Sequence, residues 1–118
     1  MPEGKLHLKI SRSNGVHVVH FADRKILEEL SITEIGEELS NLVDSQPGIK
    51  LLLNFSSVDH LSSAALGMLI TLNKRVTQAN GALKLSNINA QIYEVFKITR
   101  LNKVFDIHPT AEEALAGF

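Results

Sequence analysis

Apolar and polar residues alternate between positions 6 and 11, which is the two-residue spacing of a β-strand. Asn14-Gly15 follows and is typical of a tight hairpin turn, because both residues readily adopt positive φ angles. This turn predicts a second, antiparallel strand. The register then places apolar residues on a single face, with Leu8 opposite Phe21 and Ile10 opposite Val19.

A helical period of apolar residues appears after a less regular stretch, Asp23–Leu30. Ser31-x-x-Glu34 is typical of a capping box and predicts that the helix begins at this serine. Pro47-Gly48 predicts the end of this unit. The apolar residues of the helix share one side: Ile32, Ile35, Leu39, Leu42 and Val43.

The middle of the chain changes from strand to helix. Ile49–Phe55 is nearly all apolar, as is typical of a central strand covered on both faces. A polar turn and Leu61-Ser62-Ser63 lead into a long helix, and Asn80-Gly81 predicts its end. One flank of this helix carries Leu66, Leu69, Ile70, Asn73 and Val76.

The last third continues the alternation. Ala82–Ser86 and Val104–Ile107 are predicted strands. Asn89 is predicted to cap the helix between them, and Thr110-x-x-Glu113 to cap a short final helix. The helix after Asn89 carries Ile92, Val95, Phe96 and Thr99 on one side, and the final helix carries Ala114, Leu115 and Phe118.

The order β-β-α-β-α-β-α-β-α predicts an α/β fold with a mixed, mostly parallel sheet and helices packed against it. A chain of 118 residues fits one domain, so we expect a single domain over residues 1–118. A hydrophobic content of 44% is ordinary for a globular protein and supports a core without disulfides. The chain has no cysteine, which excludes a disulfide framework and a thiolate metal site.

The charge pattern argues against two classes of function. A net charge of −1 without a basic stripe makes nucleic-acid binding a poor expectation. Strictly apolar runs are only a few residues long, such as Met68–Ile70, far below the length of about 20 needed for a membrane span. The first residues lack a hydrophobic signal region. We therefore expect a cytoplasmic protein.

Candidate chemistry is sparse. No two of the five histidines have the i, i+4 helical spacing of a metal site, so no metal or other cofactor is predicted. No Gly-x-Ser-x-Gly elbow occurs, and Ser62-Ser63 precedes two alanines. Phosphate-binding glycine motifs are also absent. The chain is therefore not predicted to be an enzyme, and no catalytic residue is assigned.

The two serines before the long helix carry more meaning. Ser62 has the position and the side chain of a helix N-cap. Ser63 lies just inside the helix, where a phosphate would meet free amides and the positive end of the helix dipole. Such a modification would add nearly two negative charges beside small residues and expel a closely packed partner. These residues therefore predict either a simple cap or a switchable docking surface.

At this point the sequence resembles a family. The stretch from Leu51 to Leu69 (LLLNFSSVDHLSSAALGML) resembles the signature of STAS domains, a family that includes the bacterial anti-sigma factor antagonists. The shared pattern is a hydrophobic strand, Asp-hydrophobic-Ser, a short turn, and Asp-Ser-Ser/Thr-Gly-hydrophobic-Gly opening a helix. The resemblance extends over nearly the whole chain and implies a STAS-like fold. It also implies that Ser63 is the regulatory phosphoserine, with Ser62 as the second choice.

The motif departs from the family at four positions. Asn54 replaces the first aspartate, Ser62 the second, Ala64 the second hydroxyl residue, and Ala65 the glycine. The loss of a carboxylate at position 62 removes a charged cap, and the methyl of Ala65 lies where a partner backbone would approach. The implied partner-binding residues are Asp59, His60, Leu61, Ser62, Ser63, Ala64, Leu66 and Gly67.

The resemblance implies a regulatory protein in transcription and signal transduction. In the antagonists, the unphosphorylated form binds an anti-sigma serine kinase and frees the sigma factor. The protein partner predicted here is such an anti-sigma factor, and a homo-oligomer stays open. Two alternatives also stay open: a STAS scaffold module without a phosphorylation switch in a larger complex, and a sensor of a small ligand such as a nucleotide.

Overall fold

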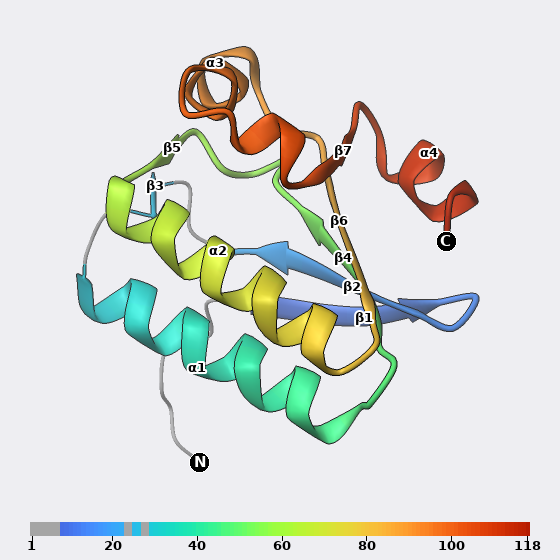
Figure 1. Cartoon of the computed structure of the whole chain (residues 1–118). Helices are drawn as coiled ribbons and strands as arrows, with labels where there is room; N and C mark the ends of the chain where they lie inside the picture. Colours follow the sequence, from blue (N-terminus) through green and yellow to red (C-terminus); the bar gives the residue numbers. More distant parts are fainter. Residues whose placement is uncertain (1–7, 23–24, 27–28) are drawn as a thin grey trace.

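Five strands form one sheet in the order β1-β2-β4-β6-β7 in the computed structural model, which describes residues 8–22, 25–26 and 29–118 (Figure 1). β1 and β2 are antiparallel, and the other neighbours are parallel. The predicted α/β fold with a mixed, mostly parallel sheet is confirmed. The strands are β1 (Leu8–Ser13), β2 (Val16–Phe21), β4 (Lys50–Asn54), β6 (Ala82–Ser86) and β7 (Asp106–His108).

The hairpin has the predicted register. Leu8 lies opposite Phe21 and Ile10 opposite Val19. Asn14 has a φ of 52° and Gly15 a φ of 81°, as a two-residue turn of this kind requires. Ile10 is 44% exposed, because β1 is the edge strand. Positions 6 and 7, where the predicted alternation begins, lie outside the described residues.

Two long helices cover one face of the sheet. α1 (Glu29–Ser45) packs beside α2 (Ser63–Gln78), and both contribute to the larger hydrophobic core (Figure 1). Four of the predicted apolar residues of α1 are buried and Leu42 is half-buried. In α2, Ile70 and Asn73 are only half-buried, and Ala65 and Leu72 fill the core instead. The apolar pattern therefore predicted the residues at the centre of each buried helix face better than the residues at the border of that face.

The predicted start of α1 is wrong. The helix begins at Glu29, so Ser31 lies inside its first turn and is not the N-cap. Glu29 and Leu30 are good helix formers, and a carboxylate in the first turn suits the helix dipole. The capping-box pattern therefore marked a residue able to cap the helix, while stronger helix formers extended it. Residues 27–28 lie outside the described part of the chain.

The opposite face carries a smaller core. α4 (Ala111–Ala116) places the fully buried Ala114 against Val16, Val18 and Leu52. Thr110 caps this helix as predicted, since its hydroxyl accepts a hydrogen bond from the Glu113 amide at 3.1 Å. The central strand β4 is thus covered on both faces, in agreement with its uninterrupted apolar sequence.

Several short elements complete the fold. β3 (Lys25–Ile26) and β5 (His60–Leu61) form a separate two-stranded parallel sheet that the sequence did not predict. α3 (Ala90–Ile98) lies beside β5 (Figure 1). A 3-10 turn at Leu101–Lys103 delays the last strand, which begins at Asp106 rather than at Val104 as predicted. On α3, Ile92 and Phe96 are buried as expected, whereas Val95 is 40% exposed.

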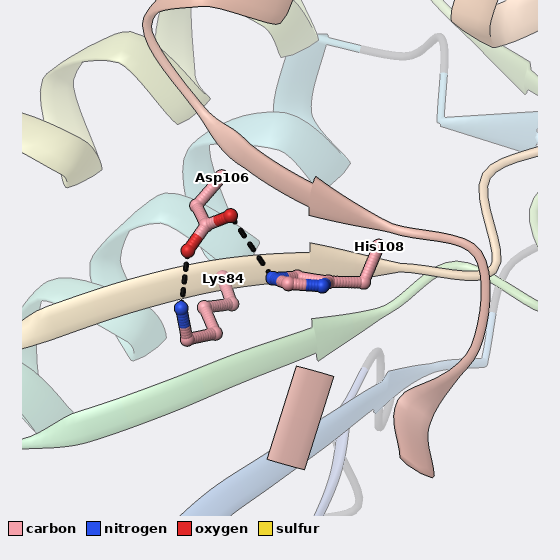
Figure 2. Close-up of polar contacts among 3 residues, drawn as sticks. All are labelled: Lys84, Asp106 and His108. Carbon is pink, nitrogen blue, oxygen red and sulfur yellow. Dashed lines mark hydrogen bonds and ion pairs between the residues drawn. The ribbon is translucent and has the colours of Figure 1, made fainter. Parts of the chain in front are cut away.

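A polar cluster lies on the α4 side of the sheet. Asp106 on β7 binds Lys84 of the neighbouring strand through one carboxylate oxygen (Figure 2). Its other oxygen lies 2.9 Å from Nε2 of His108. The hydrogen bond from Lys84 is the main reason that the pKa of Asp106 lies below its ordinary value, although partial burial acts in the opposite direction. The Lys84 ammonium also lies 5.2 Å from the ring centre of Phe118, so the cluster connects the strands to the end of the chain.

This cluster predicts an acid-sensitive contribution to stability. Because the pKa of Asp106 is lower in the folded chain, the contribution is present above the ordinary aspartate pKa near 3.8 and is lost as pH falls through the folded value. The Asp106 side chain is 51% exposed, so salt should weaken the effect. We expect Asp106→Asn to lose less stability than wild type between pH 7 and pH 3 in urea unfolding. Lys84→Met should behave alike, and an unchanged pH profile in both variants would contradict this prediction.

Candidate docking site

The candidate site lies in the connection between the end of β4 at Asn54 and the start of α2 at Ser63. Ser62 has extended backbone angles, and its hydroxyl accepts a hydrogen bond from the Ala65 amide at 3.1 Å. Its carbonyl accepts another from the Leu66 amide at 3.1 Å. The predicted N-cap role of Ser62 is confirmed. The cap fixes the direction in which the first residues of α2 leave the loop.

The residues after this cap form a small, exposed surface. Ser63, Ala64 and Gly67 are exposed on the outer side of α2, while Ala65 and Leu66 face the core. A Cβ at Gly67 would have nothing within 4 Å, so the space above this residue is open. We call Ser63, Ala64 and Gly67 the small-residue surface. At Gly67, none of the residues that the structure describes obstructs the close approach of another molecule.

The other sequence-predicted residues lie around or beneath this surface. His60 is exposed, and Asp59, Leu61 and Ser62 are half-buried. Leu66 is only 8% exposed and packs in the core, so it supports the surface from below. Ala65 is fully buried, and its methyl therefore does not point toward an approaching partner, contrary to the sequence-based interpretation. This substitution of the family glycine leaves the outer side of α2 unchanged.

The loop before the cap is held by polar contacts. Asn54 is 7% exposed, and its Oδ1 accepts a hydrogen bond from the Ser56 amide at 2.8 Å. An amide oxygen thus performs a contact that needs only an acceptor, so the change from the family aspartate keeps this turn. Asn89 was predicted only as a helix cap, but its Nδ2 also donates to the carbonyls of Val58 and Asp59. No local sequence pattern predicts this contact with the loop, because it joins residues about 30 positions apart.

A groove of about 610 Å³ continues from the small-residue surface between α1 and α2. Ala64 and Gly67 line its start, and Arg75 lines its far part. Gly36 of α1 packs closely against Met68 of α2, since an added Cβ would lie 3.0 Å from Cγ of Met68. Arg75 is engaged with Asp44 of α1 at 3.6 Å. The exposed start of α2 is therefore continuous with a larger concave region.

The described part of the chain has neither a metal-binding group of histidine and acidic side chains nor a membrane-spanning helix. Within residues 8–22, 25–26 and 29–118, no group of three histidine, aspartate or glutamate side chains could hold a metal ion. His17 is 8% exposed, and burial followed by the charge of Arg12 lowers its pKa, which favours the neutral form. No helix in the same ranges has the length and apolar character needed to cross a membrane.

The role of Ser62 can be tested directly. Ser62→Ala removes the acceptor for the Ala65 amide and should lower the free energy of unfolding by about 1 kcal/mol. Ser62→Asp, which restores a capping acceptor at the positive end of the helix dipole, should retain wild-type stability. Urea denaturation followed by circular dichroism measures both. Equal stability of Ser62→Ala and wild type would contradict the capping role.

The STAS domain family matches residues 10–114, and the chain belongs to this family. The protein is 33% identical over 66 residues to a TM1081 homologue from Thermotoga neapolitana, a match that covers 56% of this chain and 58% of the relative. It is 29% identical over 68 residues to the anti-sigma-B factor antagonist of Bacillus subtilis, which covers 58% of this chain and 62% of that protein. The chain thus spans about three fifths of the length of these relatives. Their family of antagonists is regulatory rather than catalytic.

Solved structures show the same fold. An anti-sigma-factor antagonist (STAS) domain protein from Planctomyces limnophilus superposes with a TM-score of 0.84 at 19% identity, covering 93% of this chain and 96% of that one. The Bacillus cell fate determinant SpoIIAA in its phosphorylated form superposes with a TM-score of 0.68 at 16% identity, covering 92% and 96%. The predicted STAS-like fold is therefore confirmed.

Proposed function

We propose that this protein is an anti-sigma factor antagonist that binds an anti-sigma serine kinase in the cytoplasm. The observation that carries the proposal is the small-residue surface at the start of α2, which is exposed and open above Gly67. A partner can approach the backbone closely there, and such tight packing is sensitive to added bulk or charge. The surrounding residues proposed to contact the partner are Asp59, His60, Leu61 and Ser62.

The proposal includes a phosphorylation switch at Ser63. Ser63 is exposed, whereas the hydroxyl of Ser62 is engaged with the Ala65 amide. A phosphate on Ser63 would lie near the positive end of α2, so the fold would tolerate it. A phosphate on Ser62 would instead replace the existing cap. This difference favours Ser63 over Ser62 as the phosphoacceptor, and the phosphorylated form of the structurally similar SpoIIAA supports a switch of this type.

Binding to the kinase is measured by titration calorimetry. The probe is the purified anti-sigma serine kinase encoded nearest to this chain in its own genome, with ADP present. A saturable one-site interaction that is weakened by a bulky residue at position 67 supports the proposal. The absence of measurable binding at a protein concentration of about 100 μM, about 100 times the Kd of a typical micromolar complex, would contradict the proposal.

A scaffold role is the second candidate, because Ser62 and Ala64 replace two of the polar residues of the family motif. A scaffold would assemble with further copies of itself or with related domains and would not need a phosphoacceptor. Size-exclusion chromatography with light scattering separates the two functions. A large homotypic assembly that does not bind the kinase favours the scaffold, and a small species that binds it favours the antagonist.

A further inference from the structure

Asn89 joins two elements through one side-chain amide. It lies between β6 and α3, and its Oδ1 accepts a hydrogen bond from the Ile92 amide at 2.8 Å, which caps α3. Its Nδ2 donates to the carbonyl of Val58 at 3.3 Å and to that of Asp59 at 3.2 Å. The NH2 group therefore donates to a segment about 30 residues earlier in the chain. A capping residue requires only the oxygen, so the two further bonds need another explanation.

The orientation of this amide is set by its surroundings. In the reverse orientation, the oxygen would face the Val58 and Asp59 carbonyls, and the NH2 group would face the Ile92 amide proton. All three contacts would then pair like with like. Only the orientation with Nδ2 toward the loop satisfies them, which makes Asn89 a specific donor to this segment.

The tethered carbonyls directly precede the docking site. Val58 is 1% exposed and anchors the loop in the core, while the next residues, Asp59 and His60, reach toward the surface. β5 follows with only two residues, and Ser62 then caps α2. Because β5 is so short, its own ladder to β3 gives the loop little support. The bonds from Asn89 hold the backbone at the entry to this segment.

We propose that Asn89 is a positioning residue of the docking surface. Its amide fixes the Val58–Asp59 backbone, so that Asp59, His60 and the Ser62 cap already have the geometry that the partner binds. Preorganisation of this kind reduces the ordering cost on association. The effect on the kinase rests on the proposed function, whereas the order of the loop in the free chain does not.

Asn89→Ser separates the two roles of the residue. Serine is a good N-cap and can accept the hydrogen bond from the Ile92 amide, but it lacks an NH2 group for the two carbonyls. We expect its affinity for the anti-sigma kinase to fall about tenfold, the scale of one to two lost hydrogen bonds. Hydrogen exchange measured by NMR should become faster at the backbone amides of residues 58–62. Thr110→Ala is the matched control, because it removes a helix cap on the opposite face of the sheet and should leave both readouts unchanged.

The outcomes separate this proposal from the proposed function. Wild-type affinity and wild-type exchange in Asn89→Ser would overturn the positioning role. If wild type does not bind the kinase, the antagonist function fails, and the exchange rates of residues 58–62 still decide the role of Asn89. If Asn89→Ser does not fold, the side-chain NH2 signals of Asn89 in wild type decide it. Protected NH2 protons support the tether, and protons that exchange as fast as those of exposed asparagines overturn it.

Discussion

Phosphorylation of Ser63 should weaken binding of the anti-sigma kinase by at least about 100-fold. The modification adds nearly two negative charges and a bulky group to a surface whose other members are Ala64 and Gly67. Stability should change little, because the phosphate lies near the free amides and positive dipole at the start of α2. Phosphorylation is therefore expected to lower the affinity for the kinase without lowering the stability of the fold.

The measurement combines mass spectrometry with calorimetry. The chain is incubated with the kinase and ATP, the modified residue is mapped, and the affinity of the purified phosphorylated form is compared with that of wild type. Ser63→Ala should bind the kinase and incorporate no phosphate, and Ser63→Glu should bind weakly. Ser56→Ala, at an exposed serine before β5, serves as a matched control and should be phosphorylated normally. Phosphate found on Ser62 alone, or full incorporation in Ser63→Ala, would rule out this assignment.

The sequence predicted the parts of the fold that depend on local periodicity. The hairpin register followed from Asn14-Gly15 and the alternation around Leu8, and the structure has that register. The N-cap Ser62 and the buried strand β4 were likewise set by local pattern. The start of α1 was not, because Glu29 and Leu30 extend a helix as well as Ser31 can cap one. β3 and β5 have two residues each, which is too short for a periodic signal.

The sequence predicted where the candidate site lies, but not which of its residues are buried or which distant residue contacts it. The motif placed Ser63 and Gly67 at a strand-to-helix connection, and both lie exposed there. It did not show that Ala65 is buried, which follows instead from the helical spacing that puts Ala65 on the same face as Leu69. It also could not reveal the tether from Asn89, because that contact depends on how α3 is placed against the loop. Tertiary contacts of this kind leave no local pattern.

Gly67→Leu should reduce binding of the kinase by at least about 100-fold while the chain stays folded. Gly67 is exposed in α2, and an added Cβ meets nothing within 4 Å, so the protein itself accommodates a side chain. Leucine is also a far better helix former than glycine, so the free energy of unfolding should rise by up to about 1 kcal/mol. Lost binding in a more stable protein cannot be attributed to unfolding.

Two further variants make the test specific to this surface. Gly67→Ala should give a similar gain in stability with a much smaller loss of affinity, because one methyl adds little bulk. Thr77→Leu adds the same apolar side chain at an exposed position ten residues further along α2, about 15 Å away, and should bind like wild type. Calorimetry with the kinase and thermal unfolding of all three variants are compared. If Gly67→Leu binds as tightly as Thr77→Leu, the partner does not pack on the start of α2, and the docking site must lie on another face of the protein.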